Sequence, residues 1–223
     1  MNNPLVSIIM SVYNNENSLS ECLQSILNQK YINFELLIVD DASTDNTKTI
    51  LEQVNDERVK INYNKKNLGL TNNLNILLEK SRGQLIARQD GDDLSNKNRL
   101  VKQIKFLNEN DLDACTTRAI VKNSTKLIPR FTHWIPPKLI VRYKNPFIHG
   151  TLLIKTKVIN EIGRYDENFK YAQDYKLFID LLAKGYKVKI LNEALYTLNM
   201  KNNISTKYKN EQNYFAKLAK KSI

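Results

Sequence analysis

Three carboxylates crowd into the four residues from Asp90 to Asp93, shortly after an apolar run that ends at Ala87. Charges packed this closely repel one another, so their position at the end of a buried strand indicates a bound cation. Carboxylate oxygens suit the hard cations Mg²⁺ and Mn²⁺, which in turn bind the phosphates of nucleotides. The plainer alternative is a solvated acidic turn whose Asp93 or Ser95 caps the following helix. This segment alone leaves both interpretations open.

Polar side chains also follow two other apolar runs. Ser11 and Tyr13 come after the run 5–10, and Asp41 comes after the run 36–39. Ligands of open parallel sheets bind beyond the carboxyl ends of the strands, so these segments would meet at one edge. There Tyr13 can stack on a flat base, and Asp41 can accept a ring N–H or the hydroxyl protons of a ribose. A packed Tyr13 and a helix-capping Asp41 are the alternatives.

The first hundred residues alternate between strand-like and helix-like patterns. Apolar, β-branched runs predict buried parallel strands, and stripes with helical spacing predict the helices between them. Ser18 and Glu21 form a capping-box pattern, Thr71 can cap a later helix, and Gly83 is expected to end it. The predicted strands are 5–10, 36–39, 59–63 and 85–87. This order is typical of an α/β fold with a mainly parallel central sheet and helices on both faces.

The composition is that of an ordinary globular chain, with 223 residues of which 42% are hydrophobic. No apolar run reaches the roughly 18–20 residues that span a bilayer, and the first residues lack the basic region of a secretion signal. Cys22 and Cys115 lie far apart without metal-ligand spacing, which predicts free buried thiols in a reducing compartment. We therefore expect a cytoplasmic protein.

Positive charge gathers in the middle and at the end of the chain, whose net charge is +11. Residues 115–165 hold ten basic residues and one acid, and residues 200–223 hold six lysines and one acid. Residues 1–113 are slightly acidic, with 13 basic residues against 16 acidic ones. Such a field favours an anionic partner, which means a membrane surface, a phosphorylated substrate or a nucleic acid. A proteome rich in Lys and Asn is the alternative explanation.

Several nucleotide- and nucleic-acid-binding classes lack their sequence signatures here. There is no GxGxxG and no GxxxxGK[ST] segment, so neither a dinucleotide oxidoreductase nor a P-loop NTPase is supported. A nucleotidyltransferase would carry a glycine-rich loop followed by a basic residue, and residues 11–17 contain neither. A nucleic-acid-binding protein would explain the charge, but basic residues are not interleaved with aromatic ones on one helix. A diphosphate would have to be held by the acidic segment and a divalent ion.

A series of motifs along the chain resembles the family 2 glycosyltransferases of the GT-A fold. The motifs are SIIMSVYN at 7–14, FELLIVDDASTD at 34–45, NLGL at 67–70, RQDGDD at 88–93, GRYDE at 163–167 and QDY at 173–175. The resemblance covers roughly residues 4–200. It implies a nucleotide-sugar donor, a divalent metal and transfer with inversion at the anomeric carbon.

The resemblance also implies which residues bind the donor. By position, Ser11, Tyr13 and Asp41 would bind the uracil and the ribose of a UDP donor, and the segment 90–92 stands at the family's Asp-x-Asp motif. The residues expected to line the donor site are Ser11, Val12, Tyr13, Glu16, Asp41, Asn67, Arg88, Asp90, Gly91 and Asp92.

The implied chemistry needs a metal and a base. The metal, Mn²⁺ or Mg²⁺, would bind Asp92 and Asp93 and balance the charge that builds on the leaving diphosphate. Asp174 falls where the family places its general base, although Gln173 stands in place of the Glu often seen there. A helical stripe closed by Gly185 follows Asp174, and a helix N-terminus favours the ionised carboxylate. A helix cap without a catalytic role is the alternative for Asp174.

Two further residues are candidates for the acceptor side. His149 precedes the apolar run 152–154, in a segment that borders the acceptor in this fold. A lone histidine in such a loop is more often a hydrogen-bonded structural residue, which is the alternative. Trp134 lies beside Pro136 and Pro137, where it can form a platform for a sugar ring or pack into the core.

These observations predict one GT-A-like α/β domain, with a nucleotide-sugar-binding half at 1–113, an acceptor-binding half at 114–200 and a basic helical tail at 201–223. The predicted function is transfer of a sugar from a UDP-sugar to a hydroxyl of a glycan or a lipid-linked acceptor. The resemblance implies a role in bacterial surface polysaccharide biosynthesis, such as capsule or lipopolysaccharide. A non-catalytic family member and a basic nucleic-acid-binding protein are the alternatives, although we expect no nucleic-acid partner.

The tail from Tyr208 to Lys221 is predicted to form an amphipathic helix. Its apolar side chains near one face are Tyr214, Phe215, Leu218 and Ala219, and lysines flank them. A basic amphipathic helix often lies on an anionic membrane surface, which would place the protein peripherally at the inner face of the cytoplasmic membrane. A terminal helix packed on the domain is an equal alternative.

Overall fold

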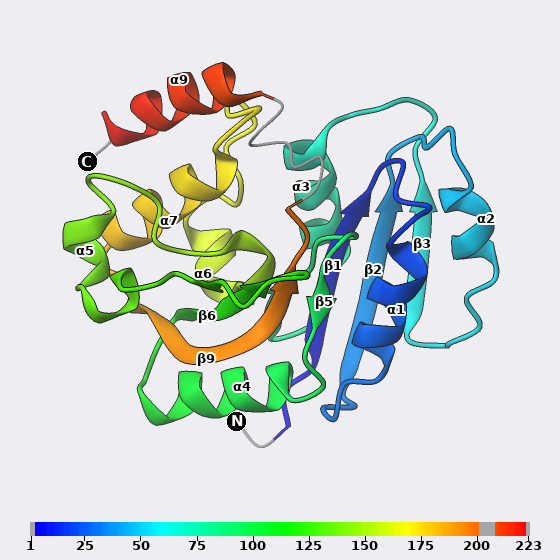
Figure 1. Cartoon of the computed structure of the whole chain (residues 1–223), viewed down its shortest axis with the longest axis horizontal. Coiled ribbons are helices and arrows are strands. Elements are labelled where there is room, and N and C mark those ends of the chain that lie inside the picture. Colours follow the sequence, from blue (N-terminus) through cyan, green and yellow to red (C-terminus); the bar gives the residue numbers. More distant parts are fainter. Residues whose placement is uncertain (1–2, 201–207, 222–223) are drawn as a thin grey trace.

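One mixed sheet carries all nine strands of the residues that the structure, a computed structural model, describes (3–200 and 208–221; Figure 1). The strands are β1 (Val6–Val12), β2 (Phe34–Asp40), β3 (Val59–Tyr63), β4 (Leu85–Arg88), β5 (Leu94–Ser95), β6 (Ala114–Val121), β7 (Leu127–Ile128), β8 (Leu153–Lys155) and β9 (Val188–Leu198). Their order is β3-β2-β1-β4-β8-β6-β9-β5, and β7 pairs with β6. The predicted parallel pairing is confirmed for β3-β2-β1-β4, whereas β8 joins β4 and β6 in antiparallel pairs.

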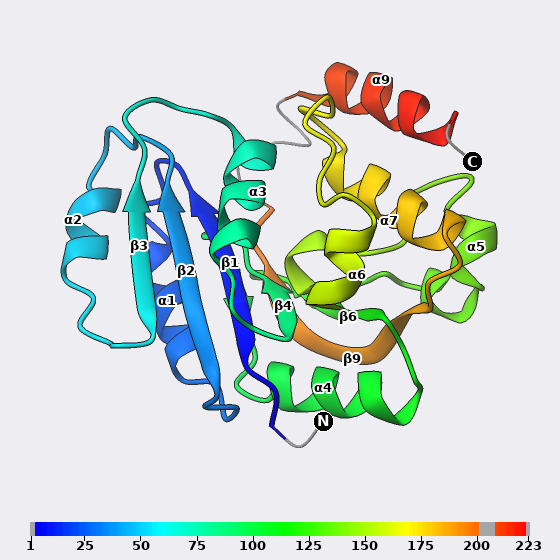
Figure 2. The same ribbon diagram turned by 180° about the vertical axis from the view of Figure 1, so that it is seen from behind.

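Helices cover both faces of the sheet, as the sequence predicts. They are α1 (Leu19–Leu27), α2 (Thr47–Glu52), α3 (Leu70–Lys80), α4 (Arg99–Glu109), α5 (Pro137–Ile140), α6 (Thr156–Glu161), α7 (Gln173–Ala183) and α9 (Lys209–Lys220), with 3-10 turns η1 (Thr132–Trp134) and η2 (His149–Thr151). Successive strand residues point to opposite faces, so Ile8 and Met10 pack with α1 and α4, while Ile9 packs with α3 and α7. Figures 1 and 2 show these two layers from opposite sides. Burial on both faces explains the unbroken apolar run of β1.

Three predicted helix signals are wrong in detail. Ser18 precedes α1, but no side-chain hydrogen bond caps that helix. The helix α3 begins one residue before Thr71, whose hydroxyl donates to the Phe169 carbonyl at 3.0 Å and so ties α3 to the segment before α7. Gly83 does not end α3. A Cβ at Gly83 would lie 2.5 Å from the backbone nitrogen of Ser7, so the glycine lets the chain pass close to β1.

Other local predictions are confirmed. Gly185 closes α7 in the left-handed region, with φ at 86°, and the N–H of Tyr186 then donates to the Leu181 carbonyl at 3.0 Å. Cys22 and Cys115 are both free and buried. Both thiols lie within the core and form no cross-link, as their spacing in the sequence indicates.

The helix predicted at the end of the chain is present as α9, while residues 201–207 of the tail lie outside the described residues. Part of its apolar face packs on the domain: the rings of Phe215 and Phe169 lie 5.8 Å apart, and Ala219 is buried. Tyr214 and Leu218 stay exposed. None of the helices in the described part of the chain is long and apolar enough to cross a bilayer.

Candidate active site

The loops that follow β1, β2 and β4 meet at one edge of the sheet, because these three strands are parallel neighbours. The N–H of Asn14 donates to the Ser43 hydroxyl at 3.0 Å, and the N–H of Thr44 donates to Oδ1 of Asn14 at 2.8 Å. A Cβ at Gly91 would lie 2.6 Å from Cγ1 of Val12, so the acidic loop rests directly on the first loop. The three polar segments that the sequence places at one edge therefore lie together.

A buried arginine holds the carboxylate of Asp90. Arg88 is 1% exposed, and its Nη2 lies 2.5 Å from Oδ1 of Asp90. The backbone N–H of Asp90 also donates to the Tyr196 hydroxyl at 3.1 Å. The guanidinium of Arg88 thus orients Asp90, and the contact of Arg88 with a donor stays a prediction.

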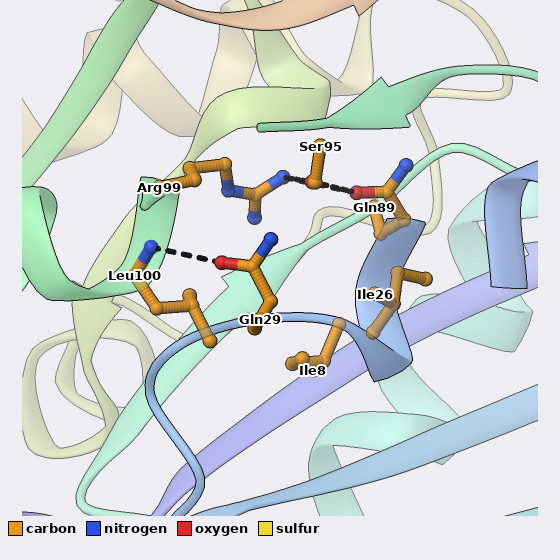
Figure 3. Close-up of a pocket in the computed structure, with 7 residues that line it drawn as sticks. All are labelled: Ile8, Ile26, Gln29, Gln89, Ser95, Arg99 and Leu100. Atoms are coloured by element: carbon orange, nitrogen blue, oxygen red, sulfur yellow. Dashed lines mark hydrogen bonds between the residues drawn. The ribbon is translucent and has the colours of Figure 1, made fainter. Parts of the chain in front are cut away.

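A buried polar network fixes the main chain of the acidic loop. The side-chain N–H₂ of Gln89 donates to the carbonyls of Asp90 at 3.0 Å and Asp93 at 3.1 Å. The side-chain oxygen of Gln89 accepts from the Ser95 hydroxyl at 2.7 Å and from Nη1 of Arg99 at 3.0 Å. Figure 3 shows the Ser95 side chain between those of Arg99 and Gln89, with a hydrogen bond to each. These hydrogen bonds restrain the main chain of the loop, although Nε of Arg99 has no hydrogen-bond partner, and sequence reasoning missed the network.

Asp92 and Asp93 differ in their surroundings. Asp93 is buried, and its Oδ1 accepts the N–H of Asn199 at 2.6 Å, just beyond the end of β9. Burial and the nearby charge of Asp90 raise the pKa of Asp93. The same two causes raise the pKa of Asp92 to about 6, although Asp92 remains partly exposed. Binding of a metal ion by Asp92 and Asp93 stays a prediction.

The ligand atoms of the acidic loop suit Mg²⁺ or Mn²⁺. Within the described residues, no group of three or more His, Cys, Asp and Glu side chains is arranged to hold an ion without further ligands. Mg²⁺ is commonly bound by one or two carboxylates, and substrate phosphates and water complete its coordination. A cation also stabilises the ionised form of carboxylates whose pKa is raised by burial and mutual repulsion. Asp92 together with a donor diphosphate fits such an ion, whereas Asp93 is engaged with the end of β9.

The residues predicted to bind the base and the ribose lie around Asp41. Asp41 is buried, and its two oxygens accept the backbone N–H groups of Leu68 and Gly69 at 2.8 and 2.9 Å. Its carboxylate thus holds the loop before α3 in place. Ser11 lies near the end of the neighbouring strand β1, and Tyr13, whose ring is half-exposed, follows that strand. Contacts of these three residues with a nucleotide stay predictions.

Three other residues predicted to line the donor site have different surroundings. The Val12 side chain is buried against the position of Gly91, and a contact of Val12 with a donor stays a prediction. Oε2 of Glu16 accepts from the backbone and the side chain of Asn46 at 3.0 and 2.8 Å, which ties the first loop to the start of α2. Asn67 is exposed in the loop between β3 and α3. Val12 and Glu16 therefore hold the loops of the site in place through their contacts.

Asp174 lies in the first turn of α7, where Nδ2 of Asn145 donates to its Oδ2 at 2.7 Å. Burial raises the pKa of Asp174, and the nearby charge of Asp90 adds to the rise. The backbone N–H of Tyr175 and the amide of Asn145 oppose it. The backbone N–H groups at the start of α7 favour the ionised form, as predicted, but burial outweighs them, so the net shift of the pKa is upward. A raised pKa brings an aspartate closer to the range of an effective general base.

His149 lies close to the acidic loop, whereas Trp134 is exposed to solvent. Nε2 of His149 lies 2.7 Å from the Tyr165 hydroxyl, and burial lowers the pKa of His149 to about 3, so its ring is neutral. A Cβ at Gly150 would lie 2.6 Å from Oδ2 of Asp90, which places η2 against the acidic loop. Trp134 is 74% exposed, which excludes its packing in the core. Acceptor contacts of His149 and Trp134 stay predictions.

Sequence reasoning missed two residues that hold the reactive segments. Asn145 precedes Pro146, a pair typical of turns, and lies 29 positions before its partner Asp174. Tyr196 lies in β9 and its hydroxyl meets the Asp90 backbone across 106 positions. Both contacts join segments far apart along the chain, so no local pattern marks these residues as part of the site.

Known proteins resemble this chain over most of its length. The family described as "Glycosyl transferase family 2" matches residues 7–171. EpsE of Bacillus subtilis, described as a glycosyltransferase, is 35% identical over 204 residues, which cover 86% of this chain and 72% of EpsE. WfgD of Escherichia coli, a UDP-Glc:α-D-GlcNAc-diphosphoundecaprenol β-1,3-glucosyltransferase, is 29% identical over 215 residues, which cover 94% of this chain and 83% of WfgD.

A solved structure has the same fold. The crystal structure of S. aureus TarS 1-349 in complex with UDP-GlcNAc matches with a TM-score of 0.77 and 23% identity, over 91% of this chain. The chain spans 60% of that TarS structure. The predicted GT-A fold is therefore confirmed. Because the family match covers well over half of its length, the chain belongs to glycosyl transferase family 2.

Proposed function

We propose that this glycosyltransferase moves a sugar, with inversion, from a UDP-sugar to a hydroxyl of a glycan or a lipid-linked acceptor. The observation that carries the proposal is the position of Asp174, a partly buried carboxylate in the first turn of α7 that the Asn145 amide holds at 2.7 Å and whose pKa the charge of Asp90 helps to raise. The UDP-GlcNAc bound to TarS and the UDP-Glc in the name of WfgD support a UDP-sugar donor. Tyr13 offers a ring for stacking on the uracil, beside Ser11 and Asp41.

In the proposed reaction, Asp174 accepts the proton of the acceptor hydroxyl, whose oxygen forms a bond to the anomeric carbon. The bond between that carbon and the donor phosphate oxygen breaks, and its electron pair leaves with the diphosphate. When bound by Asp92 and the diphosphate, Mg²⁺ or Mn²⁺ supplies positive charge where negative charge develops. Arg88 and Gln89 keep the acidic loop in the geometry that this charge balance needs.

We further propose a role in the biosynthesis of a bacterial surface polysaccharide, at the inner face of the cytoplasmic membrane. The name of WfgD describes an acceptor carried on diphosphoundecaprenol, which is a membrane lipid. The positive charge gathered in one part of this chain supports an anionic partner, such as a diphosphate-linked lipid. The acceptor half at 114–200 and the tail carry that charge.

A donor screen tests the proposal. Purified protein is supplied with UDP-glucose, UDP-N-acetylglucosamine, UDP-galactose or GDP-mannose and Mn²⁺, and the release of free nucleotide is measured. We expect release from a UDP-sugar that rises when a lipid extract supplies the acceptor and that stops in EDTA. Neither binding nor release with any donor would identify the chain as a non-catalytic family member.

A further inference from the structure

An exposed surface that is both apolar and basic covers the segment 130–144, between β7 and η2. Its large apolar side chains are Phe131 (63% exposed), Trp134 (74%), Ile135 (41%), Leu139 (58%) and Tyr143 (77%). The basic side chains among them are Arg130, Lys138, Arg142 and Lys144, all of them exposed. We call these nine residues the 130–144 surface. Proteins rarely leave so many large apolar groups together in water, and such a gathering marks a docking site.

The charge of the 130–144 surface has one sign. The sequence has no Asp or Glu between Ala114 and Asn160. In the described part of the chain, no carboxylate forms an ion pair with the four basic side chains of this surface. Aromatic rings prefer the headgroup level of a bilayer, and Lys and Arg side chains are attracted to anionic lipids. The surface therefore matches an anionic bilayer in both polarity and charge.

Around α5, apolar and basic side chains stand next to one another. The helical turn continues beyond α5, since the N–H of Tyr143 donates to the Ile140 carbonyl at 2.9 Å. Side chains four positions apart lie one turn apart on the same face. Leu139 and Tyr143 thus form an apolar pair, and Lys138 and Arg142 form a basic pair beside it. This is the amphipathic arrangement of helices that lie on membranes.

The outer face of α9 extends the surface. Nζ of Lys220 donates to the Tyr143 carbonyl at 2.5 Å, and α5 lies near the end of α9 in both views (Figures 1 and 2). Tyr214 and Leu218 of α9 are 65% and 37% exposed, and Lys217 is exposed between them. The face of α9 that does not pack on the domain therefore has the same character as the 130–144 surface.

We propose that the 130–144 surface, together with the outer face of α9, docks the protein on an anionic phospholipid bilayer. The choice of partner rests on the proposed function, because a lipid-linked acceptor is presented at such a bilayer. The segment leads directly to Asn145, whose amide holds Asp174, and the Tyr175 hydroxyl donates to the Val141 carbonyl within the segment. Docking there brings the bilayer next to the proposed base and delivers the acceptor hydroxyl to it.

Co-sedimentation of the full chain with vesicles tests the proposal. Wild-type protein should bind vesicles of phosphatidylglycerol and phosphatidylcholine, fail to bind pure phosphatidylcholine, and lose affinity as salt increases. Lys138→Glu with Arg142→Glu should weaken binding at least about 25-fold, since each basic residue contributes roughly fivefold near such a surface. Leu139→Ser with Tyr143→Ser should also weaken binding, although the charge is unchanged.

A matched control is Lys30→Glu with Lys97→Glu, which makes the same charge change at two exposed residues near the end of α1. This control should bind like wild type. The proposal is overturned if the wild-type protein does not bind, or if it binds neutral vesicles equally well. It is also overturned if the control weakens binding as much as the surface variants do, or if both surface variants bind like wild type. Nucleotide release without vesicles is measured on the same variants and should match wild type. If the protein binds vesicles but releases no nucleotide, the docking proposal stands and the proposed function is wrong.

Discussion

Asp174 and Asp92 carry raised pKa values for the same first cause, which is burial. At Asp174 the Asn145 amide limits the rise, and at Asp92 the charge of Asp90 adds to it. The position of Asp174 at a helix start could be predicted from the sequence, because the stripe that follows it has helical spacing. The direction of its pKa shift could not, because burial depends on segments that only the folded chain brings together.

Replacing Asn145 by Ala should move the pH dependence of transfer. The Asn145 N–H₂ stabilises the ionised carboxylate of Asp174, so its removal raises the pKa of Asp174 further. The base acts when ionised, and the rising limb of kcat/KM should therefore shift to higher pH, with the largest loss at low pH. Asn110→Ala, which removes a bond to the Phe106 carbonyl, is the matched control. A uniform loss at all pH values would contradict this positioning role.

Replacing Asp92 by Asn should weaken metal binding but raise the stability of the metal-free protein. The folded-state pKa of Asp92 lies above its unfolded value, so its ionised form costs stability as pH rises through about 6. At pH 7.5 without metal, Asp92→Asn should be more stable by of order 1 kcal/mol, or about 2–4 °C in Tm, and the gain should vanish toward pH 4. Mn²⁺ with UDP should raise the Tm of wild type but not of Asp92→Asn. A shift of equal size in both proteins would exclude Asp92 as the metal ligand.

Loops that follow parallel strands carry the site, and their contacts with one another decide its geometry. Strand ends, and hence the meeting of three polar loops, could be predicted from apolar runs. The helix starts were harder, because Ser18 and Thr71 have the residue types of caps but bond elsewhere or not at all. The network around Gln89 was missed, because a polar residue in a buried segment has meaning only once Ser95 and Arg99 are placed beside it.

Gly91→Ala should disturb the acidic loop through Val12. The added methyl group would lie 2.6 Å from Cγ1 of Val12, and overpacking of this kind costs about 1–3 kcal/mol. Donor affinity, measured by calorimetry with Mn²⁺, should fall with the Tm. Combining Gly91→Ala with Val12→Ala removes the clash, so donor affinity should partly recover. Failure of the second substitution to restore any affinity would place the defect elsewhere.

Across the whole molecule, one sheet joins the donor loops to the segment that holds Asp174. The parallel part, β3-β2-β1-β4, follows from alternating strands and helices in the sequence. The antiparallel strand β8 and the pairing of β6 with β9 could not be predicted, because these strands pair over long distances along the chain. Those pairings bring Tyr196 and Gly150 against the acidic loop.

The helix α9 should contribute to the stability of the whole fold. Phe215 packs near Phe169 and Tyr171, so Phe215→Ala should lower the free energy of unfolding by about 1–3 kcal/mol, less than for a fully buried ring. Tyr214→Ala, at an exposed neighbouring position, should change it by less than about 0.5 kcal/mol. Urea denaturation measures both values. Equal, small effects would show that α9 does not hold to the domain in solution.

We propose Asp174 as the base of the glycosyl transfer. The most direct test is the initial rate of transfer by Asp174→Asn, with the best UDP-sugar of the donor screen, beside calorimetry of donor binding and a Tm. Asparagine keeps the shape and can begin a helix, so donor affinity and Tm should stay near wild type. The rate should fall by about 10²–10⁴, because proton acceptance is lost. Transfer by Asp174→Asn at the wild-type rate would show that Asp174 is not the base.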